Sequence, residues 1–299
     1  MKILNLPLSR SNIDRAAHIR ADDAALEAAW QESSIVHFNG EAFLVDGAAL
    51  KVLTAKEIIG SGERIFLGQY GNDFYFLWCA DTNIGNDDEY KTLREMSSVF
   101  SDLDIGLAVS GQAFAHWHYK NLICAVCGEP LHSALGGSIR KCTNSHEHYP
   151  RTDPAIIVLV KDKDDRILLG RQSSWPEHRF STFAGFVEAG ESFEQCVARE
   201  VLEEAGVQLS EINYLGSQPW PFPQSLMVAF EATTQDPQNA RPDGVEIIEI
   251  RWYTRNDLYA AITEGTLLLP PAVSVARAMI QAWYGADRLP LPDAETWRS

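Results

Sequence analysis

Three glutamates, Glu200, Glu203 and Glu204, have the types and the spacing that most clearly indicate chemistry in this sequence of 299 residues. Residues at positions i, i+3 and i+4 of an α-helix share one face, so a helix here would bring the three carboxylates together. Like charges at this spacing repel each other, and the plain alternative is an acidic, solvated helix face. A hard divalent cation such as Mg²⁺ or Mn²⁺ prefers oxygen ligands and would turn that repulsion into binding. The spacing therefore indicates a metal site.

The residues around these glutamates predict where the helix begins and ends. Ser192 can cap its N-terminus, and Gln195 stands three residues later, where it completes a capping box. Gly206 is a natural C-terminal stop, since glycine adopts the left-handed conformation that ends many helices. Between these signals, apolar residues recur at helical spacing and would face a core. We therefore expect a helix over residues 192–205 that holds the glutamates on its other side.

A second segment, Ser217–Ser225, reads SQPWPFPQS and alternates three prolines with Trp220 and Phe222. Proline has no backbone N–H to donate, so this stiff, extended stretch cannot join the centre of a sheet. Its flat aromatic faces are presented at low entropic cost and suit stacking on a base or a nicotinamide ring. The alternative is a packed loop without a ligand, which is the commoner role of such a stretch taken alone.

A third feature is a set of cysteines with metal-ligand spacing. Cys124 and Cys127 form a CxxC knuckle, and Cys142 follows after a glycine-rich hairpin. Three thiolates and one histidine make a tetrahedral Zn²⁺ site, which His146 or His148 could complete. We favour His146. Such a site has no open position, so its role would be structural. The alternative is three free thiols.

The composition predicts a soluble, cytoplasmic protein without a membrane partner. The net charge of −16 repels bulk nucleic acid and anionic membranes, although bound cations can invert the field around a small anionic substrate. No stretch approaches the ~18–20 apolar residues of a membrane helix. Pro7 breaks the N-terminal apolar run, which makes a poor signal peptide. Five cysteines are an odd and sparse set, unlike a secreted disulfide framework.

Hydrophobic patterning predicts a mixed sheet with helices, which is an α+β fold. Strands are expected at Ala42–Val45, Arg64–Leu67, Asp73–Cys79, Ala155–Val160, Arg166–Gly170, Gly185–Val187, Leu226–Thr233 and Ile247–Tyr253. Two further helices are expected at Asp87–Ser101 and at Pro271–Tyr284, the second with a proline in its first turn. His116 and His118, on either side of Trp117, are expected at the surface or in a linker.

Taken together, these motifs resemble those of a known family. The nine fixed positions of the Nudix box are filled by Gly185, Glu191, Arg199, Glu200, Val201, Glu203, Glu204, Gly206 and Val207. The chain is similar to Nudix hydrolases, and SQPWPFPQS is similar to the signature of the NADH pyrophosphatases among them. The resemblance implies an N-terminal domain over residues 1–118, a zinc ribbon over 119–150 and a Nudix domain over 151–299. It also implies a second CxxC in the ribbon, but Ser145 stands where its last cysteine should be.

The resemblance implies a metal-dependent reaction and the residues that perform it. Glu200, Glu203 and Glu204 would hold Mg²⁺ or Mn²⁺, and a carboxylate from a later strand would complete the set. Glu249 is our candidate for that carboxylate and Glu246 is the second choice. Glu191 would stabilise the box rather than bind metal. The reaction would cut the diphosphate bridge of NADH or NAD⁺ to give a nicotinamide mononucleotide and AMP, and NAD caps on RNA present the same bridge.

The resemblance also implies a substrate pocket and a homodimer. Phe186 and Trp220 would sandwich a ring, Gln218 and Ser225 would hold the dinucleotide, and Tyr149 and Ala276 would line the pocket. The alternative substrates are ADP-ribose and dinucleoside polyphosphates, against which the nonapeptide argues. A sensor without activity would be expected to lack at least one box glutamate, and none is missing.

Overall fold

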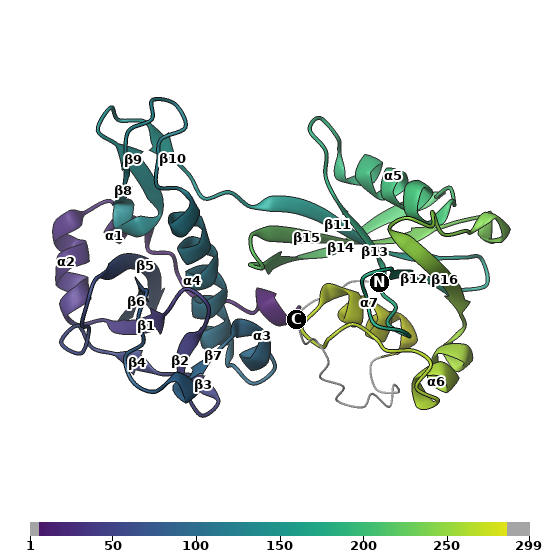
Figure 1. Ribbon diagram of the computed structural model, residues 1–299, viewed down its shortest axis with the longest axis horizontal. Coiled ribbons are helices and arrows are strands. Elements are labelled where there is room, and N and C mark those ends of the chain that lie inside the picture. The colour runs from purple at the N-terminus through teal and green to yellow at the C-terminus, as the bar shows by residue number, and fades with distance from the viewer. Residues whose placement is uncertain (1–5, 286–299) are drawn as a thin grey trace. The chain divides into compact units, whose positions relative to one another are not determined.

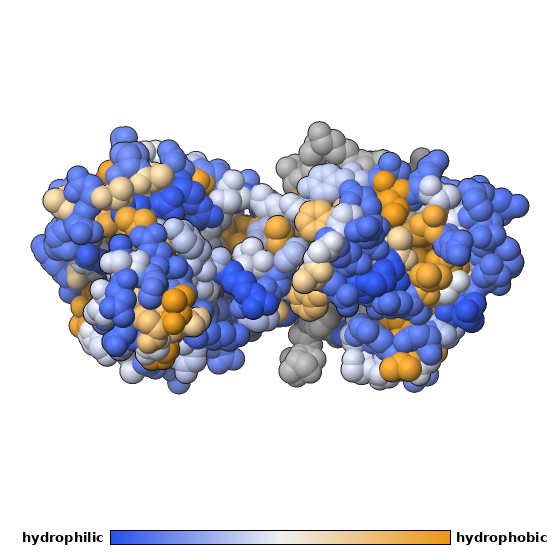
Figure 2. Space-filling view, turned by 90° about the horizontal axis from the view of Figure 1, so that it is seen from above, coloured by the Kyte–Doolittle hydropathy of each residue, from blue (hydrophilic) through white to orange (hydrophobic). Residues whose placement is uncertain are grey.

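The computed structural model describes residues 6–285 and divides the chain into two compact units (Figure 1). The C-terminal unit contains Asp153–Gln218 and the chain from Ser225 on, and the N-terminal unit contains Leu8–Thr152 together with Pro219–Gln224. The predicted ribbon thus shares one unit with the N-terminal region. In the view of Figure 2 the described surface is mostly hydrophilic, with separate apolar patches. Among the helices of residues 6–285, none combines the length and the apolar character that crossing a bilayer requires.

A mixed six-stranded sheet is the centre of the C-terminal unit. Its strands are β11 (Asp153–Lys161), β12 (Ile167–Gln172), β13 (Phe183–Phe186), β14 (Glu211–Trp220), β15 (Ser225–Thr233) and β16 (Ile247–Tyr253). The order is β14-β15-β11-β12-β16, and β13 pairs with β11 next to β12. Strand β11 is parallel to β15 and antiparallel to β12 and β13. The prolines of SQPWPFPQS begin at the end of the edge strand β14, where a missing N–H costs no central ladder bond.

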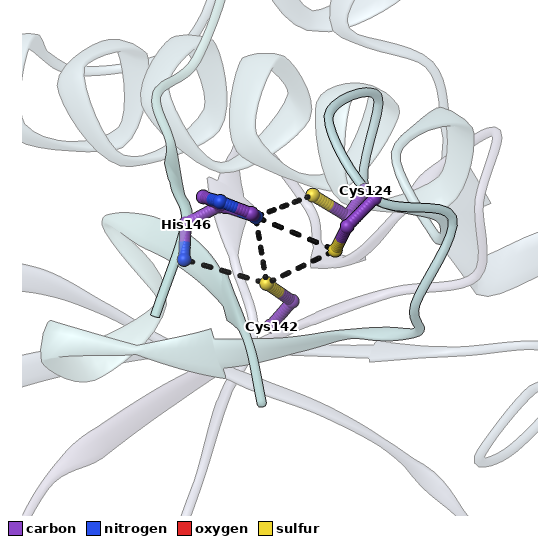
Figure 3. Close-up of side chains that lie close together, drawn as sticks. Cys124, Cys142 and His146 are labelled. Carbon is purple, nitrogen blue, oxygen red and sulfur yellow. Dashed lines mark hydrogen bonds between the residues drawn. The ribbon is translucent and has the colours of Figure 1, made fainter. Parts of the chain in front are cut away.

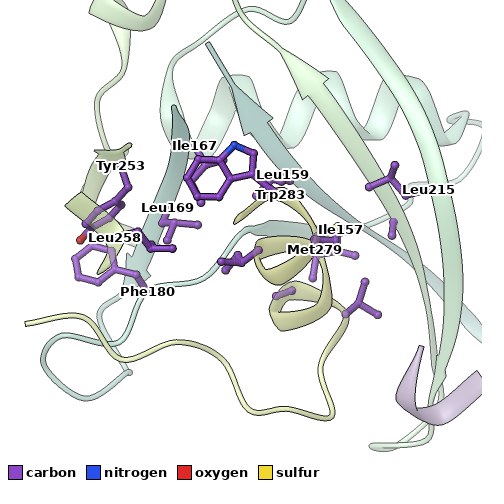
Figure 4. Packing of buried hydrophobic residues seen from close by; sticks show 14 of the residues in the cluster. Ile157, Leu159, Ile167, Leu169, Phe180, Leu215, Tyr253, Leu258, Met279 and Trp283 are labelled. Carbon is purple, nitrogen blue, oxygen red and sulfur yellow. The ribbon is translucent and has the colours of Figure 1, made fainter. Parts of the chain in front are cut away.

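Helices cover both faces of this sheet, so the predicted α+β sandwich is confirmed. On one face, α5 (Phe193–Ala205) packs Val197 and Val201, both fully buried, against the strands. On the other face, α7 (Val275–Tyr284) packs Met279 and Trp283, as Figure 4 shows. Helix α6 (Arg255–Thr263) follows β16. The closing helix starts later than expected, because its N-cap is Ser274 rather than a residue beside Pro271.

The N-terminal unit contains a seven-stranded sheet, a long helix and the small ribbon. The sheet strands are β1 (Ser34–Phe38), β2 (Phe43–Asp46), β3 (Ala49–Leu50), β4 (Val52–Leu53), β5 (Gly62–Tyr70), β6 (Asp73–Ala80) and β7 (Tyr90–Lys91). The helices are α1 (Ala17–Arg20), α2 (Asp23–Gln31), α3 (Leu93–Met96) and α4 (Asp102–Lys120). The ribbon strands are β8 (Leu131–Ala134), β9 (Ile139–Cys142) and β10 (Glu147–His148), in the order β10-β9-β8.

The predicted helix at Asp87–Ser101 is wrong, and α4 was not predicted. The segment instead holds a 3₁₀ turn, strand β7 and the short helix α3, because Thr92 caps a new start there. Ser101 then caps α4, whose buried residues lie on several sides of the helix rather than along one stripe. Amphipathic periodicity is therefore weak in α4, and Gly106 and Gly111 further obscure it. Both glycines are needed, because a Cβ would meet Ser11 Oγ at 2.6 Å and Leu77 Cδ1 at 3.0 Å, respectively.

A buried ionic group joins α4 to the ribbon inside the N-terminal unit. His118 is 2% exposed, which corrects the expectation of a surface or linker residue. Its Nδ1 lies 2.9 Å from Glu63 Oε1, and its Nε2 lies 2.6 Å from the Gly137 carbonyl oxygen. Arg140 of β9 donates to Glu63 at 3.0 Å and to the Leu131 carbonyl at 2.8 Å. Charged groups are seldom buried unless they are paired, so this network fixes the ribbon on the domain beside it.

Candidate active site and metal centre

Helix α5 places the box glutamates as the sequence predicts. Ser192 accepts the Gln195 N–H, the reciprocal bond of the capping box is also present, and Gly206 ends the helix with φ 69°. The buried valines of α5 hold the helix against the sheet, and Glu204 is buried with them. The side chains of Glu200 and Glu203 are 14% and 59% exposed. Those two carboxylates lie beside a single guanidinium, that of Arg199.

Arg199 neutralises part of the acidic face. Its Nε and Nη2 donate to the two oxygens of Glu191 at 2.8 and 2.9 Å, and its Nη1 donates to Glu200 at 2.8 Å and to Glu203 at 3.1 Å. The bonds from Arg199, helped by the Glu188 N–H, lower the pKa of Glu191 to about 2. Glu191 is thus an ionised structural partner of the arginine, which is the role expected for it from the box.

The first box glycine makes room for the metal-site carboxylate. A Cβ on Gly185 would come within 2.0 Å of the carboxylate carbon and Oε1 of Glu200. Since such contacts are far inside van der Waals distance, any side chain at Gly185 would displace the Glu200 carboxylate. The Gly-to-Glu spacing of the box therefore has a steric reason as well as a conformational one.

Glu204 is the most perturbed carboxyl of the cluster. Its side chain is almost fully buried, and its Oε2 has no hydrogen-bond partner within the part of the chain that the structure describes. Burial, followed by the charges of Glu246 and Glu200, raises the pKa of Glu204 to about 8. A buried, unpartnered carboxylate oxygen among other carboxylates is the arrangement that a divalent cation stabilises. The residues present therefore fit Mg²⁺ or Mn²⁺.

The later strand contributes Glu246 rather than Glu249 to this cluster. Glu249 is opposite Arg171 in the β12–β16 ladder, so both side chains are on the same face of the sheet. That face is the one that α7 covers, since Leu169, two residues from Arg171, packs in the α7 core. Glu249 is held there by Arg171 Nε at 3.2 Å and Arg251 Nε at 2.7 Å. The structure thus does not bring Glu249 to the carboxylates of α5.

Glu246 stands just before β16, beyond a register shift of the ladder. Its charge helps to raise the pKa values of both Glu204 and Glu200, which places it near those carboxylates. Gln172 Nε2 donates to Glu246 Oε1 at 3.2 Å and orients it. The second choice from the sequence is thus the residue that the structure places with the metal-binding candidates.

The two predicted stacking residues are partly or largely accessible within their own units. Phe186 ends β13 in the C-terminal unit and is 59% exposed. Trp220 belongs to the N-terminal unit, where its ring packs edge-on against Phe222 with centroids 5.0 Å apart. The guanidinium of Arg94 lies over both of those rings, 3.9 Å from the Phe222 centroid and 5.3 Å from that of Trp220. Arg94 was not predicted near these rings, because it is distant from them in the chain.

The other predicted substrate residues are in different environments. Gln218 is fully buried and donates to the Val273 carbonyl at 3.0 Å, and the Ala276 methyl lies in the α7 core. A contact of Ala276 with substrate would therefore have to come from its backbone. Ser225 begins β15 and is half-buried. Tyr149 is 66% exposed and donates to Glu147 Oε2 at 2.9 Å.

The ribbon brings Cys124, Cys127, Cys142 and His146 together, with all four candidate ligand atoms within 4.8 Å of one another (Figure 3). Zinc–ligand bonds of about 2.3 Å to sulfur and about 2.0 Å to nitrogen give tetrahedron edges of about 3.8 Å and about 3.6 Å. Cys127 and Cys142 Sγ are 3.8 Å apart, and His146 Nδ1 lies 3.3–3.6 Å from the three sulfurs. The donor set therefore fits zinc. His148 Nε2 lies 3.2 Å from Cys124 Sγ, at one side of the cluster.

Comparison with known proteins shows which family this chain is similar to. The NUDIX domain family matches residues 151–274. A protein called NAD-capped RNA hydrolase NudC, from Mycobacterium bovis (strain BCG / Pasteur 1173P2), is 39% identical over 298 residues, which cover 94% of this chain and 95% of the relative. A protein of the same name from Salmonella heidelberg (strain SL476) is 40% identical over 184 residues, or 60% of this chain and 68% of the relative. The chain is also similar to the crystal structure of a NUDIX hydrolase from Nitrosomonas europaea, with 25% identity and a TM-score of 0.39 over 45% of this chain and 78% of that one.

The box, the fold and this similarity define a Nudix hydrolase. The chain belongs to the NADH pyrophosphatase family of Nudix hydrolases, whose curated members at 39% identity are called NudC.

Because Glu204 is buried, we expect the stability of the metal-free protein to depend on pH. In the folded, metal-free protein the pKa of Glu204 is about 8, whereas the unfolded chain releases this proton near the ordinary glutamate pKa of 4.5. The folded state binds more protons in this window, so its stability falls as pH rises from about 4.5 to about 8. Glu204→Gln removes this loss. In EDTA, we expect the melting temperature of the variant to exceed that of the wild type increasingly from pH 5 to pH 8, as measured by differential scanning calorimetry. A gap that is the same at every pH would contradict the assignment.

The ribbon geometry predicts which histidine binds zinc. His146→Ala should lower the zinc content of the purified protein, measured by inductively coupled plasma mass spectrometry, because it removes one of four ligands. His148→Ala is the matched control and should retain the metal, since His148 lies outside the four-residue cluster. Loss of zinc from the His148 variant alone would reverse the assignment.

Proposed function

We propose that this chain hydrolyses the diphosphate bridge of NADH and NAD⁺ to AMP and a nicotinamide mononucleotide. The oxygen of a water molecule bonds to one phosphorus while the bond from that phosphorus to the bridging oxygen breaks. Each product then carries a terminal phosphate, and the two protons of the water go to these phosphates or to solvent according to pH. The observation that supports this reaction best is the similarity over 94% of the chain to a protein called NAD-capped RNA hydrolase, with every box carboxylate present.

We assign the metal site to Glu200, Glu203, Glu204 and Glu246. Mg²⁺ or Mn²⁺ at this site would neutralise phosphate charge and make water a better nucleophile. The task of the protein is to hold the carboxylates in place. Arg199 ties Glu200 and Glu203 together, and Gln172 orients Glu246. Glu249, the candidate from the sequence, remains an alternative only if its two arginine partners release it.

We also assign the recognition of the nicotinamide end to Phe186 and Trp220. Their exposed or half-buried rings offer flat faces for stacking, which tolerates a planar ring in either oxidation state. Tyr149, Ser225 and the Ala276 backbone would contribute further contacts, as the family resemblance implies. Gln218 would act from within by holding the Val273 carbonyl. A structural Zn²⁺ would sit in the ribbon.

Removal of the NAD cap from RNA follows from the same chemistry. The bridge in the cap is the same as in free NAD, and the relatives that share most of the chain have this activity in their name. The net charge of −16 does not favour strong contacts to an RNA backbone. We therefore propose that the cap, rather than the body of the RNA, is what the enzyme recognises. We further propose, by resemblance, that the protein is a cytoplasmic homodimer. Light scattering would measure its mass in solution.

A substrate panel tests the proposed reaction. Purified protein is given NADH, NAD⁺, ADP-ribose or diadenosine polyphosphates with Mg²⁺ or Mn²⁺, and products are separated by chromatography, with EDTA as the control. We expect NADH or NAD⁺ to be the best substrate and to yield AMP with the nicotinamide mononucleotide. Clear preference for ADP-ribose or a dinucleoside polyphosphate would keep the Nudix chemistry and replace the substrate.

Two strand variants test the assignment of the fourth carboxylate. Glu246→Gln should lower kcat on the order of 100-fold, because it would weaken the hold on the metal ion that would neutralise phosphate charge. Glu249→Gln is the matched control on the other face of the sheet and should lower kcat much less. Glu204→Gln should abolish turnover. The opposite order for the two strand variants would return the role to Glu249.

A further inference from the structure

The aromatic part of SQPWPFPQS is held by the N-terminal unit. Pro219–Gln224 groups with Leu8–Thr152, whereas Gln218 and Ser225 on either side group with the C-terminal unit. The six residues are therefore a loop that leaves one compact body and is packed in the other. Residues of the N-terminal unit therefore hold Trp220 in place, although that unit has no sequence motif that indicates substrate binding.

Helix α4 supplies two contacts to the backbone of this loop. Gln112 is 4% exposed, and its Nε2 donates to the Pro221 carbonyl at 2.7 Å. His116, one turn later on the same helix, has its Nδ1 3.4 Å from the Pro223 carbonyl. Neither proline has an N–H, so the loop can offer only carbonyls at these two positions. Pro221 is buried, so its carbonyl oxygen depends on a protein donor, and the Gln112 amide supplies it.

Gln112 binds the residue that lies between the two aromatic residues in the sequence. Pro221 separates Trp220 from Phe222, and the rings pack edge-on at an interplanar angle of 71°. Arg94 of α3 lies over both rings and restricts them from another side. Rotation of the peptide between Pro221 and Phe222 would turn the Phe222 ring relative to Trp220, and the Gln112 bond to the Pro221 carbonyl opposes that rotation. The Gln112 contact therefore helps to set the mutual orientation of the Trp220–Phe222 pair.

We propose that Gln112 is a positioning residue that orients Trp220 for the nicotinamide ring, so that the N-terminal domain sets the preference for that end of the substrate. This inference rests on the proposed function for its substrate. Gln112 acts through the loop and does not touch the reacting phosphates. Losing its donor leaves the Pro221 carbonyl without its partner and frees the ring pair, while the carboxylates that perform hydrolysis are unaffected.

The test compares Gln112→Met, which keeps the length of the side chain and removes the donor, with wild type. We expect KM for NADH to rise about 3- to 10-fold, the range typical of one lost hydrogen bond, with kcat unchanged. ADP-ribose keeps the diphosphate and lacks the nicotinamide ring, so its KM, or its inhibition constant if it is not turned over, should not change. Amide hydrogen exchange of the peptide spanning residues 217–225 should become faster, without change in the peptides of α5.

Gln69→Met is the matched control. Gln69 also donates from Nε2 to a backbone carbonyl of the N-terminal unit, that of Gly71 at 3.0 Å, but this bond is exposed and Gln69 is distant from the loop in sequence. It should leave KM and the exchange of residues 217–225 unchanged. Gln112→Glu, which also lacks the amide donor, replaces Gln112→Met if that variant does not fold.

Three results would overturn the inference: unchanged exchange in the loop, an equal rise of KM for NADH and ADP-ribose, or faster exchange throughout the N-terminal unit. Failure of the proposed function gives a different result, namely a wild-type enzyme that does not cleave NADH. In that case the exchange experiment still reports whether Gln112 holds the loop.

Discussion

The whole catalytic region depends on holding like charges together. Glu200, Glu203 and Glu204 repel one another, and the burial of Glu204 adds to the cost of ionising it. The protein offsets this with two devices. Val197 and Val201 anchor α5 to the sheet by apolar contact on one side, and Arg199 gathers the acidic side chains on the other. A free carboxylate oxygen is left for a cation, which is the component that makes the arrangement favourable.

The proposed substrate-binding loop, Ser217–Ser225, depends on a different property, which is its low conformational freedom. Prolines stiffen the loop of Trp220 and Phe222, and they reduce its backbone donors, although the Phe222 N–H still donates to the Trp220 carbonyl. Helix α4 supplies further donors to the loop carbonyls, although the helix contains no recognisable motif. The buried network of His118, Glu63 and Arg140 joins that helix to the ribbon. A metal at the ribbon would thus stabilise the unit that holds the aromatic loop.

Several features could be predicted from the sequence because they are local. The capping box at Ser192, the stop at Gly206 and the shared face of the glutamates follow from helical geometry over a few residues. The β16 strand, with bounds Ile247–Tyr253, follows from its apolar composition and was predicted with those limits. The helix predicted over Asp87–Ser101 was wrong, because Thr92 caps a separate short helix, Leu93–Met96, within that segment. Helix α4 was missed because a helix that is buried on several sides has no clear polar face.

The sequence by itself determined the family, the box and the identity of the metal-binding helix, since each is written in fixed spacings along one segment. Only the tertiary structure decided which later glutamate joins that helix. Glu246 and Glu249 are three residues apart, and the register shift beside Gln172 decides which of them faces α5. It likewise decided that His146 completes the cysteine cluster and that Gln112 holds the aromatic loop. These choices depend on the direction of side chains from elements distant in the chain, and no local pattern contains that information.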